Sequence, residues 1–382
     1  MADSISIIPV LPNEIIKEIL LKLPPNSLLK CMCVSKSWLQ LISSPHFVKT
    51  HLKLTANDKG CSHHRVLFRG LERNFKFCCL PPLFYKEQSF ELLDMDSPVE
   101  NPTFSAYIVG STNGLICLFK RKRETFLWNP TIRKSKELPK LQVDLTLGCS
   151  YYCKYGFGYD ELHDDYKVVY IDYYGNSSYI NIYSLRTDSW RTVNELQDIF
   201  LVNSSGKFVN GKLYWVSSTG IGINNVCNII SFDLADETWG KLELPSCGEV
   251  DSHFILGVVG SDLSLIYTCR LGTTTSDVWI MKDCGVNVSW TKLFTIKYPQ
   301  NDGLYMCSPI FTFSIHFHES NKGEFLLFLP PLIMIYDGST RQLEHADDVK
   351  GCPAKIYVES LVNPLTISGR GRRSLETSQS LS

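Results

Sequence analysis

The sequence lacks an excess of charge, a long apolar run and a leader-like start, and each absence excludes a class of protein. Its 382 residues include 38 lysines and arginines against 39 aspartates and glutamates, a net charge of −1. We therefore expect no general attraction to nucleic acid or to an anionic membrane. The longest apolar stretch, residues 325–336, is interrupted by Pro330 and Pro331 and falls short of the ~20 residues that a membrane helix needs. Residues 1–10 have neither a basic start nor an apolar core, so we expect a cytoplasmic location, a nuclear one, or both.

The sequence has many cysteines but few patterns that are typical of metal or cofactor sites. None of the 14 cysteines are spaced C-x-x-C. Their close pairs do not form a zinc-ligand set: Cys31 and Cys33, Cys78 and Cys79, Cys149 and Cys153. Two weak alternatives stay open, namely Cys61, His63 and His64 together with Cys78 and Cys79, and His316 together with His318. We expect reduced cysteines, no metal and no cofactor.

The sequence gives little support for catalysis. It has no G-x-S-x-G nucleophile elbow, and no helix pattern follows the glycines at residues 156–158 and 220–222 to hold a phosphate. The acid pairs Asp164–Asp165 and Asp347–Asp348 would point to opposite faces of a strand, which favours solvated turns over a general acid and base. We expect no catalytic residue and a protein that is not an enzyme.

The stretch from Leu11 to Leu52 is where the helical pattern lies. Apolar residues recur along residues 15–23 at the spacing of one helix face, and Pro24–Pro25 end that segment. Ser27 is a candidate N-cap for a second segment over residues 28–34, and Ser35 for a third that carries Trp38. Three short helices of this size cannot hide so many large apolar side chains among themselves, which favours a docking module for another protein. The alternative is a small helical cap packed on the rest of the chain.

These residues, LPNEIIKEILLKLPPNSLLKCMCVSKSW followed by SPHFVKTHL, resemble the F-box of plant proteins. The resemblance implies a three-helix module over residues 5–52 that docks on the SKP-type adaptor of a cullin-RING ubiquitin ligase. It assigns adaptor binding, or support of the adaptor-facing surface, to twelve residues: Leu11, Pro12, Ile15, Ile19, Leu20, Leu23, Pro24, Leu28, Leu29, Val34, Lys36 and Trp38.

The remainder, after a polar stretch at residues 53–64 that we expect to be a linker, is dominated by short β-type runs. A motif of a strand, a turn and a second strand recurs in it, with Trp190, Trp239 and Trp290 at equivalent positions. Weaker copies place Lys134 and Leu343 there. A period near fifty residues predicts a kelch-like β-propeller, with residues 65–105 and the C-terminal strand 354–361 forming a further blade jointly. The alternative is a pair of β-sandwiches.

The order of GSTNGLICL, LWNPTIRKSKELP, YGFGYDELHDDYKVV, IYSLRTDSWR, VNGKLYWV and SFDLADETW resembles the plant F-box-associated domain. The predicted fold class is α+β multidomain: a small N-terminal three-helix F-box followed by an all-β propeller at residues 65–365. Residues 366–382 are rich in serine and arginine, and we expect a disordered tail.

The resemblance implies a substrate receptor of an SCF-type ubiquitin ligase, with the SKP-type adaptor, cullin and RING protein as partners and a target protein on propeller loops that the sequence does not identify. Two alternatives stay open. One is an F-box scaffold that acts outside a ligase, and the other is a propeller lectin or enzyme with an incidental helical head.

Overall fold

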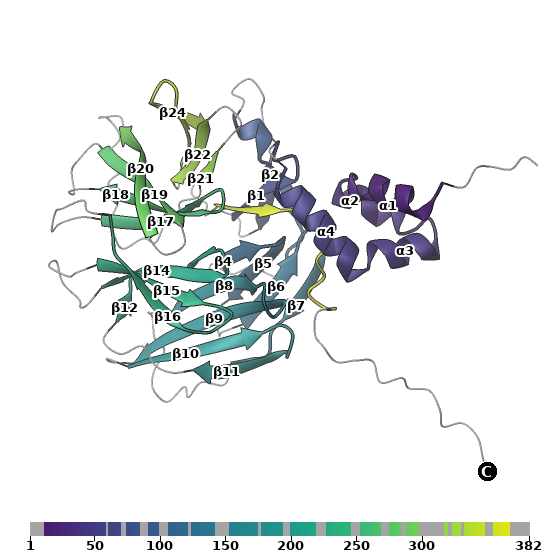
Figure 1. Ribbon diagram of the computed structural model, residues 1–382, viewed down its shortest axis with the longest axis horizontal. Helices are drawn as coiled ribbons and strands as arrows, with labels where there is room; N and C mark the ends of the chain where they lie inside the picture. The colour runs from purple at the N-terminus through teal and green to yellow at the C-terminus, as the bar shows by residue number, and fades with distance from the viewer. Residues whose placement is uncertain are drawn as a thin grey trace, which may run out of the picture.

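The protein consists of a helical head at one end of a ring of β-sheets (Figure 1). The computed structural model describes residues 11–58, 60–69, 74–84, 91–98, 106–120, 124–141, 153–174, 177–193, 199–218, 227–245, 253–268, 275–283, 288–297, 317–319, 323–329, 332–347 and 354–366. The tail predicted at residues 366–382 lies outside these ranges except for its first residue, as does His316. No helix in the described ranges is long and apolar enough to cross a membrane.

The head contains four helices: α1 (Asn13–Leu21), α2 (Pro25–Cys31), α3 (Lys36–Ile42) and α4 (Pro45–Ala56). The sequence predicted the first three and missed α4. The signal for α4 is Ser44 followed by Pro45, because Ser44 Oγ accepts a hydrogen bond from the N–H of Phe47 and proline suits the first helical turn. The expected linker at residues 53–64 is therefore helical as far as Ala56, and the first strand begins at His64.

The strands form five hydrogen-bonded sheets within the described residues. The first sheet joins both ends of the β region, in the order β25 (Ala354–Val358), β1 (His64–Arg69), β2 (Phe75–Cys79) and β3 (Leu93–Met95). A short 3-10 helix, η1 (Pro81–Phe84), follows β2. The pairing of β25 with β1 confirms the prediction that residues 65–105 and the C-terminal strand share a blade.

Three further sheets follow in chain order. They contain β4 (Tyr107–Thr112), β5 (Leu115–Lys120), β6 (Glu124–Asn129) and β7 (Lys134–Glu137); β8 (Lys154–Asp160), β9 (Asp165–Tyr174), β10 (Ser177–Ser184) and β11 (Ser189–Val193); and β12 (Phe200–Leu201), β13 (Lys207–Val209), β14 (Lys212–Ser218), β15 (Cys227–Asp233) and β16 (Trp239–Leu242).

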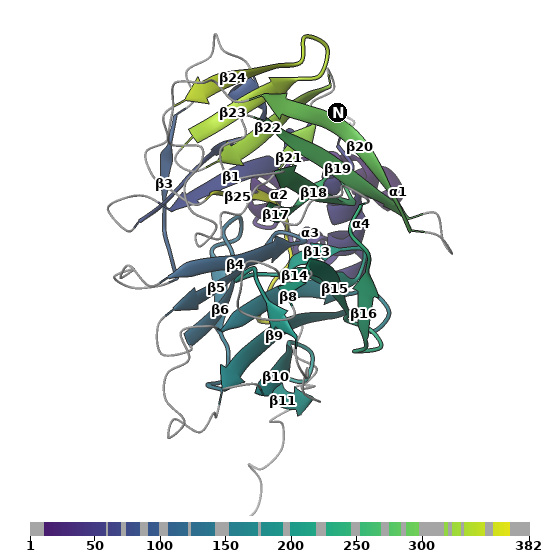
Figure 2. The same ribbon diagram turned by 90° about the vertical axis from the view of Figure 1, so that its left-hand side faces the viewer.

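The last sheet has eight strands and folds as two consecutive four-stranded meanders. The first is β17 (His253–Val259), β18 (Asp262–Thr268), β19 (Thr275–Asp283) and β20 (Val288–Lys297); the second is β21 (Phe317–Glu319), β22 (Glu324–Leu329), β23 (Leu332–Asp337) and β24 (Gln342–Asp347). The two meanders are joined by a single parallel pair, Val259 with Phe317. When the two halves of the last sheet are counted separately, the described strands form six blades. The blades are arranged around a ring (Figure 2).

Hydrophobic cores lie between consecutive blades and close the ring. In β5, for example, Leu115 and Cys117 face the core shared with the β8–β11 blade, whereas Ile116 and Leu118 face the core shared with the first blade. Both faces of an inner strand are therefore covered, which explains the continuous apolar run LICLF where a half-exposed strand would alternate. Stacked blades rather than two sandwiches account for the repeat.

The repeat marks the hairpin that leads into the outermost strand of each blade. Arg133, Asp188, Glu237 and Arg341 precede or begin these strands with positive φ angles of 52–58°. The tryptophan that follows ties one blade to the previous one: Trp190 Nε1 donates to Pro139 O at 2.7 Å, and Trp290 Nε1 donates to Glu243 O at 2.9 Å.

A candidate docking surface on the helical head

Serine and proline residues mark the starts of the helices in the head. Ser35 Oγ accepts from the N–H of Trp38 at 3.2 Å and caps α3 as predicted. The prediction that Ser27 caps the second helix is wrong, because α2 begins two residues earlier with Pro25 at its first position. That proline loses no hydrogen bond there and has the φ angle a helix needs.

The core of the head is small and includes a residue from the far end of the chain. Leu20, Leu28, Ile42 and Phe47 are fully buried together with Leu361, which follows β25. Ile132, from the turn between β6 and β7, packs against the same cluster. The head is therefore not independent of the ring.

The structure divides the twelve predicted docking residues into three groups. Leu20 and Leu28 are core residues, so they can support docking only by holding the fold. Leu23, Leu29 and Trp38 are half-buried and pack against that core. The other seven are exposed: Leu11, Pro12, Ile15, Ile19, Pro24, Val34 and Lys36.

Large apolar side chains stand in solvent on the head. Leu11, Ile15 and Ile19 are 53%, 42% and 48% exposed, and the two isoleucines share one face of α1 because they are four residues apart. Val34 and Leu39, before and within α3, are 65% and 45% exposed. The sequence analysis did not include Leu39 among the docking residues. The signal was its position next to Trp38: because Trp38 packs inward on the seven-residue helix α3, its neighbour Leu39 points outward. Exposed apolar residues concentrated on so small a module indicate a protein-binding surface.

Comparison with known proteins agrees with this geometry. The family model "F-box domain" matches residues 8–50, and the model "F-box associated beta propeller domain" matches residues 75–364, most of the chain. The chain belongs to the F-box-associated β-propeller family. Two Arabidopsis thaliana relatives are similar over nearly their full lengths. F-box protein CPR1 is 28% identical, with 94% of this chain and 90% of the relative covered. F-box/kelch-repeat protein At3g23880 is 29% identical, with 93% and 96% covered.

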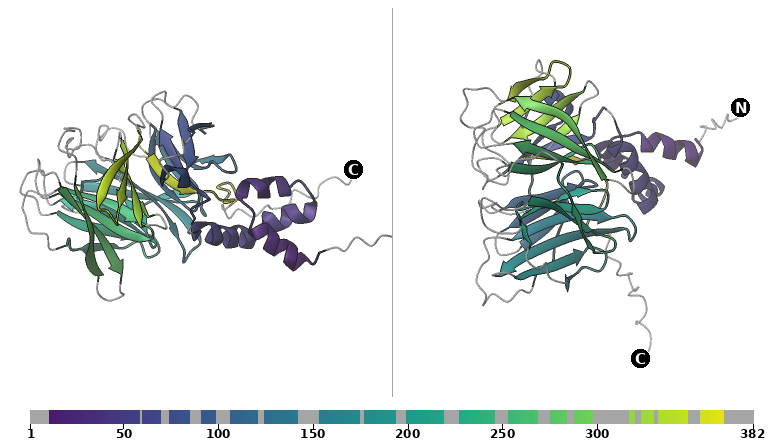
Figure 3. Two further views of the ribbon diagram at one scale, coloured as in Figure 1. Left: turned by 90° about the horizontal axis from the view of Figure 1, so that it is seen from above. Right: turned by 60° about the vertical axis from the view of Figure 1, so that its left-hand side comes forward.

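In this F-box protein, helix α4 attaches the F-box to the propeller (Figure 3). Val48 and Leu52 pack on the core between the second and third blades, and Lys49 Nζ lies 2.6 Å from Asp164 Oδ2 in the turn between β8 and β9. Within the first blade, Glu359 Oε2 accepts from Arg65 at 2.9 Å, which holds the segment leading to Leu361 against β1. These contacts of α4, together with Leu361 and Ile132 in the core of the head, form the joint between the F-box and the propeller.

His51 in α4, together with His63 and His64 around the start of β1, is expected to make the fold less stable in acid. His51 is 1% exposed, its Nε2 lies 2.8 Å from Leu23 O, and burial lowers its pKa. Burial also lowers the pKa values of His63 and His64. When the pKa of a histidine is lower in the folded than in the unfolded protein, the free energy of unfolding decreases as the pH falls below the unfolded pKa of about 6.5.

We expect the midpoint temperature of thermal unfolding to decrease between pH 7 and pH 5, and to decrease less in His51→Gln. An identical decrease in both proteins would show that His51 does not cause the pH dependence.

The alternative sites considered in the sequence have structural roles. Asp164 pairs with Lys49, while buried Asp165 accepts from Ser184 Oγ at 2.5 Å and from the N–H of Arg186 at 2.8 Å. Across the described ranges, no group of three or more histidine, cysteine, aspartate or glutamate side chains is placed to hold a metal ion. Cys61, His63, His64, Cys78 and Cys79 lie in these ranges and do not form such a group. The combination of an F-box with this propeller is in general that of a non-catalytic substrate-recognition subunit.

Proposed function

We propose that the protein is the substrate receptor of an SCF-type cullin-RING ubiquitin ligase, acting in the cytoplasm, the nucleus or both. The F-box binds the SKP-type adaptor, and through it the cullin and RING protein, while the propeller binds the target. The observation that carries the proposal is the exposed face of α1, where Ile15 and Ile19 stand in solvent although Leu20 beside them is buried.

The topology of the ring supports target binding at the end away from the F-box. The turns at residues 113–114 and 161–164 lie at the F-box end, where Asn113 O accepts from Ser360 and Asp164 meets Lys49. Two longer connections, residues 219–226 and 243–252, start and finish at strand ends on the opposite side. Loops on a rigid scaffold commonly carry recognition.

Such a receptor accelerates ubiquitin transfer without making or breaking a bond itself. By holding the target in the same assembly as the ubiquitin-conjugating enzyme, it raises the effective concentration of the target's lysines. The fixed joint between F-box and propeller restricts where those lysines can lie, so part of the selectivity rests on geometry.

The proposal is tested by substituting glutamate for exposed apolar residues of α1 and measuring the affinity for the adaptor. In Ile15→Glu/Ile19→Glu, two apolar anchors are lost, and we expect adaptor affinity to fall by about a thousandfold or more because each interface anchor contributes ~2 kcal/mol or above. The matched control is Leu54→Glu, since Leu54 is 53% exposed on α4, a helix that faces the propeller. Affinity is measured by titrating the full chain with purified adaptor.

Co-purification separates the alternatives. Adaptor with cullin supports the receptor, adaptor without cullin supports a scaffold outside the ligase, and neither supports a propeller lectin or enzyme. Leu28→Ala is unsuitable as a docking test, because removing a fully buried leucine costs about 2–5 kcal/mol of stability. The half-buried Trp38 has the same disadvantage to a lesser degree.

A further inference from the structure

A pocket of about 570 Å³ lies between the outer strands of the fourth and fifth blades. One wall is the end of β16 and the chain that follows it, residues 241–245, and the other is Trp279 of β19 and Trp290 of β20. These three strands lie on the same side of the ring (Figure 2). The pocket is therefore next to the start of the connection 243–252, which the proposed function places at the target-binding end.

The walls of the pocket are mainly apolar. Leu242, Leu244, Trp279 and Trp290 pack against the core that the two blades share, and Pro245 is buried beside them. We call these five residues the tryptophan pocket. Its volume is within the range of about 300–1,000 Å³ that is usual for ligand sites, and its aromatic walls suit a ligand with flat apolar faces.

The two tryptophans differ in what their indole N–H groups bind. Trp290 Nε1 donates to Glu243 O at 2.9 Å. Trp190, at the equivalent position two blades earlier, donates to Pro139 O in the same way. The N–H of Trp279 is buried, but no residue in the described ranges accepts a hydrogen bond from it. Because a buried donor without an acceptor is unfavourable, a ligand that brings an acceptor beside Trp279 is favoured.

The surroundings of Trp279 distinguish it from another tryptophan with an unpaired N–H. Trp215 also has no acceptor among the described residues, but it is 0% exposed in the core between the third and fourth blades. Trp279 is only half-buried and lines the pocket. Of these two donors, that of Trp279 is the one placed beside a space that a ligand can enter.

We propose that the tryptophan pocket binds a proline-containing segment of the target protein. The proline ring packs on the apolar walls, and a backbone carbonyl of the segment accepts the hydrogen bond of Trp279 Nε1, as in other aromatic-lined grooves that recognise proline-rich peptides. The inference rests on the proposed function, because the segment belongs to the protein that the propeller recruits. It gives that target a chemistry: an extended stretch with proline in it.

Proline matches the polar groups of the pocket as well as its shape. An X–Pro amide has a carbonyl that accepts a hydrogen bond and no N–H that needs a partner, and Trp279 offers a donor. A proline-rich segment is also extended before it binds, so little conformational entropy is lost. A sugar would bring several hydroxyl groups, whereas the charged side chains at the pocket, Lys241 and Glu243, are exposed to solvent. The observations therefore favour a peptide.

The test uses the full chain and three fluorescent probes: hexaproline, hexaglycine and cellohexaose. We expect hexaproline to bind about tenfold or more tightly than the other two. Trp279→Phe keeps an aromatic ring but removes the N–H, and we expect it to weaken hexaproline binding about threefold to tenfold, as for the loss of one hydrogen bond. Trp190→Phe is the matched control, because it is the same substitution outside the pocket.

Nuclear magnetic resonance of the wild-type chain with isotope-labelled tryptophan gives a second readout, at the N–H itself. The indole signal that is missing from Trp279→Phe belongs to Trp279. We expect hexaproline to move this proton signal downfield, because the N–H gains an acceptor, and to leave that of Trp190 in place. Thermal unfolding shows that the variants fold, and Trp279→Phe is expected to unfold no earlier than Trp190→Phe, since only Trp190 loses a hydrogen bond.

Each outcome supports or overturns the site. Equal binding of hexaproline and hexaglycine, or unchanged hexaproline binding by Trp279→Phe, overturns it. Tighter binding of cellohexaose also overturns it, in favour of a carbohydrate site. Adaptor affinity is measured separately, so a chain that binds hexaproline but no adaptor refutes the proposed function and leaves the site intact. A chain that binds the adaptor but not hexaproline does the reverse.

Discussion

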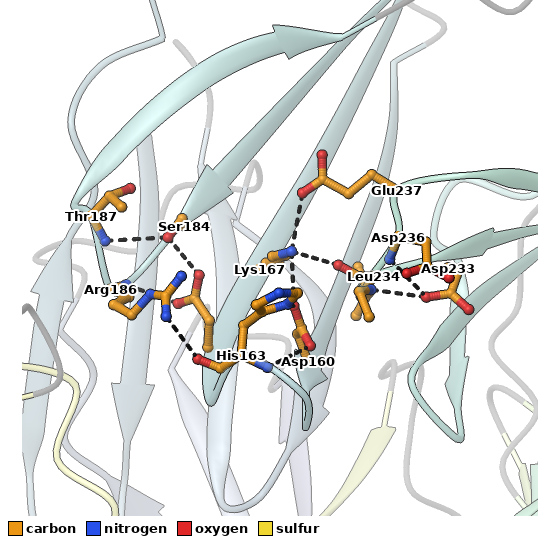
Figure 4. Close-up of polar contacts among 12 residues, drawn as sticks. Asp160, His163, Lys167, Ser184, Arg186, Thr187, Asp233, Leu234, Asp236 and Glu237 are labelled. Carbon is orange, nitrogen blue, oxygen red and sulfur yellow. Dashed lines mark hydrogen bonds and ion pairs between the residues drawn. The ribbon is translucent and has the colours of Figure 1, made fainter.

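Lys167→Met is expected to destabilise the propeller by about 3–5 kcal/mol, because it removes one member of a buried ion-pair network. Lys167 Nζ contacts Asp160, Glu237 and the carbonyl oxygen of Leu234, which it reaches at 2.5 Å (Figure 4). Without it, the fully buried carboxylate of Asp160 keeps, among the described residues, only the N–H of His163 at 3.1 Å and the ring of His163 at 2.8 Å. The third and fourth blades lose one of their polar links at the same time.

Urea unfolding of the full chain measures this loss. The control is Lys292→Met, since Lys292 lies 2.8 Å from Asp277 but is 43% exposed, and such pairs contribute ~0–1 kcal/mol. A loss in Lys167→Met no larger than in the control would show that the network is not a source of stability.

Asn129→Ala is expected to loosen both the ring and the F-box. Its buried side-chain amide donates to Ser360 O at 3.0 Å, to Ser360 Oγ at 3.1 Å and to Val362 O at 2.8 Å, and its Oδ1 accepts from the N–H of Thr131 at 2.9 Å. Each buried polar group left unpaired costs about 1–3 kcal/mol, so the total is expected to be several times the effect of an ordinary surface substitution. The segment after β25 would then be held less firmly, with Leu361 on it.

Limited proteolysis combined with urea unfolding separates these effects. We expect cleavage within the F-box to be faster in Asn129→Ala than in the wild type, together with a lower unfolding midpoint. Asn363→Ala is the control, because Asn363 Oδ1 accepts from Leu365 N–H at 3.0 Å in an exposed turn. Faster ring unfolding with an unchanged rate of F-box cleavage would mean that the C-terminal segment does not stabilise the F-box.

Local patterns predicted much of the fold. The spacing of Ile15, Ile19 and Leu23 predicts a helix, and the surplus of apolar residues in the head agrees with the exposure of Ile15 and Val34. The tryptophan period predicts the blades because each copy marks the same hairpin. The sequence does not indicate which propeller loops would contact a target.

Contacts between distant parts of the chain could not be predicted in this way. Nothing in the residues around Asn129 indicates that its amide binds Ser360, and nothing around Leu361 indicates a place in the core of the head. Leu20 and Leu28 were grouped with exposed neighbours because a helical period shows which residues share a face, but not whether that face meets the protein's own core or a partner.

The position of Leu361 near the end of the chain has a consequence for biosynthesis. The helices of the head leave the ribosome before the propeller, but their core lacks Leu361 until almost the whole propeller has been translated. A prematurely terminated chain therefore carries an incomplete head as well as an open ring. The core of the head is therefore complete only in chains that also carry the closing strand of the propeller.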